Sequence, residues 1–270
     1  MLRKGIPLIL CPSLLAVFAL VSAGQSVANK PTWAKKGLTF PVGCSRAIHP
    51  IRPIKDCRPL RIPSPDGKSV VEISYNTPAD YPDIEIASLR VSRLGRYLGD
   101  VDPVGSVESE LTWSPDSKAF FVNGNDNGYG DDHLAVHLLD DPHLGPGYIT
   151  GEVARDMVRS FPPCQAKDAE DDCAELAADP DGFIGVVGLD WIGTSSKMVV
   201  MAQVTCSSSM GGINCQVLGY EIEVPSGKIL RRMQPKEFAR RWQHSMAWKF
   251  EDPGPAEFKE GEGSPASVKK

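Results

Sequence analysis

The sequence predicts a mainly β fold of antiparallel sheets, and three observations support this class. A strand–turn–strand unit recurs along the chain, with two clear copies and a degenerate third. The 270 residues include 25 glycines and 23 prolines, roughly half as many again as ordinary usage, which favours turns over long helices. Only two short segments carry a helical pattern of apolar residues. The 41% hydrophobic content is typical of a globular chain long enough to bury a core.

The first residues predict an export signal. A short basic region precedes an apolar run from Gly5 to Val21, and small residues follow at Ala23 and Ala28. The run contains two prolines and is shorter than the roughly 20 residues of a membrane-spanning helix. We therefore expect residues 1–23 to be a cleaved signal peptide, with a retained anchor as the alternative. The mature chain is then periplasmic or secreted, with no stable membrane insertion.

The charge balance argues against nucleic acid as a partner. The chain has 29 basic and 34 acidic residues, a net charge of −5. Binding to a phosphate backbone needs a strongly basic face. We therefore expect no nucleic-acid binding.

The cysteines predict disulfides. Six cysteines remain outside the signal segment, an even number in a chain expected to enter an oxidising compartment. They fall into neighbouring pairs that bracket turn-rich loops, although six cysteines allow 15 connectivities. No C-x-x-C pair exists, which weighs against structural zinc. The six are Cys44, Cys57, Cys164, Cys173, Cys206 and Cys215.

The repeated unit is a predicted hairpin, and its turn residues indicate the type of turn. The first copy, Leu60–Tyr75, contains Ser64-Pro65-Asp66-Gly67-Lys68 between two strand patterns. Serine first and proline second suit a type I turn. The second copy, Leu111–Asn123, contains Ser-Pro-Asp-Ser-Lys, and the third, Leu189–Val204, keeps only Trp191 and Lys197. Further strands are expected after each hairpin, at 83–91, 96–99, 133–139, 216–224 and 228–232.

The Ser-Pro-Asp-Gly-Lys turns resemble the WD40-like repeats of TolB-type periplasmic β-propeller proteins. The resemblance covers about Leu60–Met233 and implies propeller-like, four-stranded units. It implies little about activity, because its motif consists of turn and packing residues. Propellers close with four to eight blades, and three units are recognisable here. The sheets are therefore expected either to stand in an open arrangement or to include blades that have lost the motif.

Around these repeats we expect a linker or covering segment at 24–54, a single domain at 55–250 and a disordered tail at 251–270. An insertion between the second and third copies is expected to hold a helix at 151–160, capped by Thr150, and a solvated acidic loop. A longer C-terminal amphipathic helix is expected after Pro235. Its apolar residues recur every four positions: Phe238, Trp242, Met246 and Phe250. This stripe either packs on its own domain or anchors a partner.

A loop rich in oxygen ligands follows the second hairpin and is the expected binding surface. Its candidate residues are Asn123, Asn125, Asp126, Asn127, Asp131 and Asp132. Loops at one rim of a repeat fold commonly carry function. An irregular calcium site is an alternative, but the EF-hand register fails because Leu134 stands where a glutamate is required.

Two histidines define the enzymatic alternative. His133 and His137 lie on one face of the strand that follows this loop, beside several aspartates. Imidazole and carboxylate groups can hold a transition metal that activates water, which would make a metal-dependent hydrolase. No nucleophile elbow or phosphate-binding glycine loop is present. The leading expectation is therefore a non-enzymatic, cofactor-free module that binds a protein partner in the cell envelope.

Overall fold

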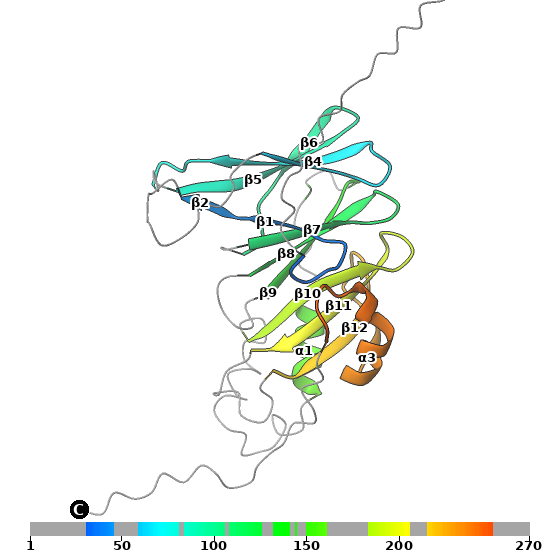
Figure 1. The fold of residues 1–270 in the computed structure, drawn as a ribbon. Helices are drawn as coiled ribbons and strands as arrows, with labels where there is room; N and C mark the ends of the chain where they lie inside the picture. Colours follow the sequence, from blue (N-terminus) through cyan, green and yellow to red (C-terminus); the bar gives the residue numbers. More distant parts are fainter. Residues whose placement is uncertain are drawn as a thin grey trace, which may run out of the picture.

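The computed structural model describes residues 31–45, 59–80, 84–105, 108–125, 132–140, 144, 150–160, 183–205 and 215–250. Within them the chain is mainly β. Three antiparallel sheets lie one after another in chain order, as a fan-like open stack (Figure 1). The predicted signal segment and C-terminal tail lie outside the described residues. No helix in the described part is long and apolar enough to span a membrane.

The first sheet is built on the first repeat. β3 (Leu60–Pro63) and β4 (Ser69–Asn76) form its hairpin. β5 (Ile84–Arg93) pairs with β4, and β6 (Arg96–Val101) pairs with β5. The predicted strands are confirmed, and an additional strand, β2 (Gly43–Ser45), pairs with the start of β5.

The second and third sheets repeat this plan. The second holds β7 (Glu108–Trp113), β8 (Ala119–Asn125) and β9 (Asp132–Leu138). The third holds β10 (Ile184–Trp191), β11 (Lys197–Val204), β12 (Val217–Glu223) and β13 (Ile229–Met233). Each predicted hairpin and each predicted following strand is present. The second sheet gains β1 (Leu38–Pro41), which pairs with β7 and completes the order β1-β7-β8-β9.

The segment expected as a linker or covering therefore contributes strands. β1 and β2 both fall within 24–54, and β1 pairs with a strand about 70 residues later in the chain. Two such short strands carry almost no periodic signal of their own. Their structure depends on distant partners.

Cys44, on β2, and Cys215, before β12, are each disulfide-bonded. The other predicted cysteines lie outside the described residues, so the pairing stays a prediction.

Two short helices flank the third sheet. The inserted helix α1 (Gly151–Arg159) is confirmed, with Val153 and Met157 buried. Thr150 is its N-cap residue, but the threonine side chain makes no capping hydrogen bond. α3 (Pro235–Trp242) begins at the predicted proline.

The C-terminal helix is shorter than predicted. The helical stripe was expected to reach Phe250, but α3 ends at Trp242 and is followed by a 3-10 turn, η4 (Gln243–Ser245). The chain then becomes extended so that Met246 can form a β-bridge with Ala34. Met246 and Phe250 are still buried against the third sheet. The prediction that these apolar residues pack on the domain is therefore confirmed, whereas the predicted length of the helix is wrong.

Three apolar clusters hold the stack together. One lies between the first and second sheets, around Phe40, Leu89 and Phe120. Another lies between the second and third sheets and includes Phe121, Tyr220 and the buried face of α1. The third covers the far face of the third sheet with α3, Trp33 and the C-terminal residues.

The free face of the first sheet is polar. A row of alternating charge crosses four strands through the register pairs Arg61–Glu72, Glu72–Arg90 and Arg90–Asp100. Ion pairs join Arg61 to Glu72 at 3.3 Å and Arg90 to Asp100 at 3.7 Å. One end of the stack is thus solvated and the other is covered by α3. A polar or covered outer face is typical of the terminal units of a repeat array. The described sheets therefore form an open stack and not a closed ring.

Candidate functional site

The predicted binding loop divides into a buried part and a part outside the described residues. Asn123 is fully buried within β8. Asn125 donates a 2.8 Å hydrogen bond to Asp132 across the ends of β8 and β9. Asp126, Asn127 and Asp131 lie outside the described residues. Asn123 therefore cannot contact a partner directly, and its role is structural.

Asn123 joins the second sheet to the third. Its amide nitrogen donates to the Gly188 carbonyl at 2.8 Å, and its amide oxygen accepts the Gly188 N–H at 2.7 Å. The same nitrogen also lies 3.3 Å from Glu110. One side chain thus satisfies both backbone groups of a residue beside the irregularity in β10.

Glu110 holds the N-terminal segment in place. This buried carboxylate accepts the backbone N–H groups of Thr32, Trp33 and Ala34 at 2.8–3.0 Å. Burial raises the pKa of Glu110, while the backbone and Asn123 hydrogen bonds act in the opposite direction. A Cβ atom on Gly37 would fall 2.2 Å from the Glu110 carboxyl carbon. The carboxylate is thus enclosed by its own chain.

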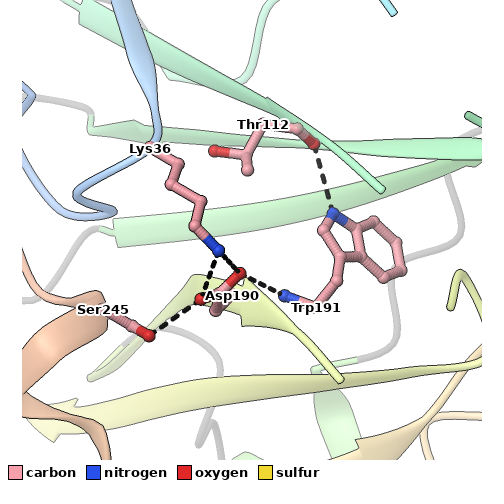
Figure 2. A network of polar contacts seen from close by, with 5 residues as sticks. All are labelled: Lys36, Thr112, Asp190, Trp191 and Ser245. Atoms are coloured by element: carbon pink, nitrogen blue, oxygen red, sulfur yellow. Dashed lines mark hydrogen bonds and ion pairs between the residues drawn. The ribbon is translucent and has the colours of Figure 1, made fainter. Parts of the chain in front are cut away.

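A second carboxylate joins the segment before β1 to the segment after α3 (Figure 2). Asp190 accepts from the Lys36 amino group at 3.0 Å and from the Ser245 hydroxyl at 2.8 Å. It also accepts the Trp191 N–H at 2.9 Å. Sequence reasoning missed this cluster because its members come from β10 and from opposite ends of the chain. Every group in it has a protein partner, so we assign it to structure.

The two histidines differ in their exposure to solvent: His133 is partly exposed and His137 is buried. His137 is 1% exposed and stacks on Phe120, with ring centroids 4.9 Å apart. Its Nδ1 lies 2.9 Å from the Leu144 carbonyl, which can only accept, so Nδ1 carries the proton. Its Nε2 is buried and has no hydrogen-bond partner. Burial lowers the pKa of His137.

This placement bears on the hydrolase alternative. His133 is partly exposed and His137 faces the apolar cluster between the first two sheets. Within the described ranges no three His, Cys, Asp or Glu side chains form a group suited to a metal ion. Two of the aspartates that the alternative requires fall outside those ranges. The metal site therefore stays a sequence-based prediction.

The repeated turns meet along one edge of the stack, which we call the turn edge. It comprises the turns 64–68, 114–118 and 192–196. Within each of the first two turns, serine donates to aspartate: Ser64 to Asp66 at 2.7 Å, and Ser114 to Asp116 at 2.8 Å. Each serine also accepts the N–H of the first residue of the next strand. The repeat residues thus close their own turns.

The turns are also bonded to one another. The Asp66 N–H donates to the Ser117 hydroxyl at 3.0 Å, and the Ser195 hydroxyl donates to Asp116 at 2.9 Å. Ser117 occupies the left-handed position held by glycine in the first turn (φ 59°). The same side chain that bears this strain supplies the link to the neighbouring turn.

The repeat tryptophans make an equivalent contact. The Trp113 indole N–H donates to the Ile62 carbonyl at 3.2 Å, and the Trp191 indole N–H lies 3.4 Å from the Thr112 carbonyl. Each tryptophan therefore contacts the corresponding residue of the preceding sheet. The first repeat, whose sheet is the first of the described stack, has Pro63 at this position. The third repeat, whose sheet is the last of the described stack, has Thr194 in place of the linking aspartate. Among the described sheets, the repeat residues that make these links are therefore replaced where no neighbouring sheet receives them.

The turn edge presents basic side chains to solvent. Exposed lysines occur at the same place in each repeat, and the β5–β6 turn adds two arginines beside them, since the Leu94 N–H donates to the Lys68 carbonyl at 2.7 Å. The basic residues in and beside the turn edge are Lys68, Arg93, Arg96, Lys118, Lys197 and Lys228. Lys228 lies in the turn after β12, where the Val224 N–H donates to the Ser196 carbonyl at 2.9 Å. This group is the candidate interaction surface, and it lies at the opposite end of β8 from Asn125.

No family model matches the chain, and no curated protein or solved structure matches it. The fold and the turn contacts themselves define the class: a mainly β protein of three propeller-like sheets in an open stack.

Proposed function

We propose that this protein is an exported, non-enzymatic interaction module that binds a protein partner of the cell envelope through its turn edge. The observation that carries the proposal is the bonding of the three turns into one row, through Asp66–Ser117 and Asp116–Ser195. A row of linked turns holds side chains from three sheets in fixed relative positions. Such pre-organisation lowers the entropy lost on binding.

We further propose that the repeats are related to the WD40-like repeats of TolB-type proteins. The Ser-Pro-Asp turns, the tryptophan before the second turn and the four-stranded plan of the second and third sheets support the relation. The link between neighbouring units through the repeat aspartate supports it as well. The relation concerns architecture and carries no activity.

The chemistry of the described polar residues is consistent with a binding role. The two buried carboxylates, Glu110 and Asp190, are fully engaged in holding the chain ends. The repeat serines and aspartates close turns and link sheets. Basic side chains at the turn edge stay available to a partner.

The test is photo-crosslinking of the full chain in the cells that produce it. A crosslinking residue is placed at the exposed Pro115 on the turn edge or at the exposed Asn76, at the other end of β4. We expect a specific adduct from the turn edge, and saturable binding when the adduct partner is purified and mixed with the protein. Absence of an adduct from both positions, or an adduct whose purified partner does not bind, would overturn the proposal.

A further inference from the structure

The tip of the β5–β6 hairpin combines two features that lower the stability of the fold. Arg93 and Arg96 form the last register pair, and Leu94 and Gly95 make the two-residue turn between them. Leu94 is 76% exposed, more than any other large apolar residue that the structure describes. The hairpin tip lies beside Lys68 on the turn edge.

The first feature is the backbone of Leu94. Its φ is 51° and that of Gly95 is 76°. A two-residue hairpin turn with both φ values positive favours Asn-Gly or Asp-Gly. Leucine in this conformation is strained, because its Cβ crowds the backbone. An asparagine would relieve the strain and remove an exposed apolar side chain at the same time.

The second feature is the arginine pair. Like charges directly opposite each other on neighbouring strands are destabilising. In the described part of the chain no ion pair joins either arginine to a carboxylate, whereas Arg90 on the same sheet pairs with Asp100. Two unfavourable choices therefore coincide at one exposed tip, and nothing in the fold requires either of them.

We infer that this tip, residues Arg93–Arg96 with Lys68, is the docking element for an acidic segment of a protein partner. Leu94 enters an apolar recess of that segment, and the three cations face its carboxylates. This inference rests on the proposed interaction function and specifies its contact. Although the whole chain is acidic, with net charge −5, Lys68, Arg93 and Arg96 lie together at this tip, so charge attraction favours an acidic segment there. Such asymmetry orients the encounter.

A protein partner fits this tip better than a membrane does. A single exposed leucine buries too little apolar surface to hold a folded domain on a bilayer, where stable attachment takes two signals. In a protein interface, a few anchor residues carry most of the binding energy.

The test uses two variants that are expected to fold better than the wild type. Leu94→Asn supplies the residue preferred by the turn, and Arg96→Glu converts the like-charge pair into a cross-strand ion pair. Each is expected to raise Tm by about 2 °C. The matched control is Leu230→Asn, which removes an exposed leucine (43%) from β13. A random peptide display library is selected against the full wild-type chain, and selected peptides are then titrated against each variant.

The inference predicts peptides rich in Asp and Glu around one apolar residue. Their affinity should fall at least tenfold with Leu94→Asn and with Arg96→Glu, stay unchanged with Leu230→Asn, and weaken with added salt. Peptides that bind all variants equally would overturn the tip assignment while leaving an interaction module. Failure to select any peptide would also overturn the tip, and the crosslinking experiment then decides the proposed function separately. Binding of wild type to vesicles of phosphatidylserine and phosphatidylcholine, lost in both variants, would overturn the protein partner in favour of a membrane surface.

Discussion

Asn123 pairs with the backbone of Gly188 as a neighbouring strand would, giving one hydrogen bond of 2.8 Å and accepting another of 2.7 Å. The two residues lie on different sheets and 65 positions apart in the chain. A side chain thus completes the hydrogen bonding of a strand at the place where β10 departs from regular register. The second and third sheets are held in one relative position by this contact.

Replacing Asn123 should therefore weaken the whole fold. Asn123→Leu leaves the Gly188 N–H and carbonyl buried without partners, which costs about 2–4 kcal/mol of unfolding free energy. The measurement is the urea midpoint with an unchanged slope. Asn125→Ala, at the partly exposed end of the same strand, serves as the control and should cost less than about 1 kcal/mol. Equal losses in the two variants would contradict the structural role of Asn123.

Glu110 should make stability depend on pH in a defined direction. Burial raises the pKa of Glu110 above the ordinary 4.5. Between these two pKa values, the folded chain therefore keeps the Glu110 proton that the unfolded chain has released. This contribution is complete below about pH 4.5 and is lost as pH rises through the folded-state pKa. The free energy of unfolding of the wild type, minus that of Glu110→Gln, should therefore decrease from pH 4.5 to pH 7.5. Glu72→Gln, on the solvated face, provides the comparison for a surface carboxyl.

His137 should act in the opposite direction. Its pKa is lowered by burial from the ordinary 6.5, so below about pH 6.5 the unfolded chain takes up a proton that the folded chain does not. Stability should then fall by up to about 1.4 kcal/mol for each pH unit. His137→Gln removes this slope between pH 6.5 and 5.5. His244→Gln, at an exposed site, should keep it, and a slope that survives in His137→Gln would contradict the assignment.

The packing of α3 depends on the absence of a side chain at Gly219. A Cβ atom there would lie 1.9 Å from the ring of Phe238. Gly219→Ala should displace this ring and cost about 1–3 kcal/mol, with faster proteolysis of α3. In Gly151→Ala the new atom meets only the flexible end of Arg155, at 3.4 Å, and stability should not decrease.

The bond between neighbouring turns should appear as a coupling energy. A double-mutant cycle of Asp116→Ala and Ser195→Ala is expected to give about 0.5–1.5 kcal/mol at pH 7. Although burial alone raises the pKa of Asp116, the hydrogen bonds from Ser114, Ser195 and Lys118 lower it overall. The coupling should therefore persist above pH 4 and decrease as Asp116 is protonated in stronger acid. Additive single effects at pH 7 would show that the turns are not linked in solution.

The elements that could be predicted from the sequence are those whose structure depends on neighbouring residues in the chain. Ser64-Pro65-Asp66-Gly67 defines its own turn, so the hairpin could be derived from those residues alone. β1 could not, because its four residues become a strand only beside β7. Asn123 was interpreted as a loop ligand for the same reason, since its partner Gly188 is remote in the chain. The turn edge was missed although a signal existed: Pro63 and Thr194 mark the first and last repeat when the copies are aligned residue by residue.

The contacts between Trp33–Lys35 and Ser245–Ala247 have a consequence for the order of folding. The Lys35 N–H donates to the Ser245 carbonyl at 2.8 Å, and the Ala247 N–H donates to the Trp33 carbonyl at 2.9 Å. Residues that follow the third sheet in the chain therefore hold residues that precede the first two sheets. Contacts of such sequence separation form slowly, because the entropy of closing a long loop must be lost first. A growing chain therefore lacks this closure until the third sheet and α3 have been synthesised.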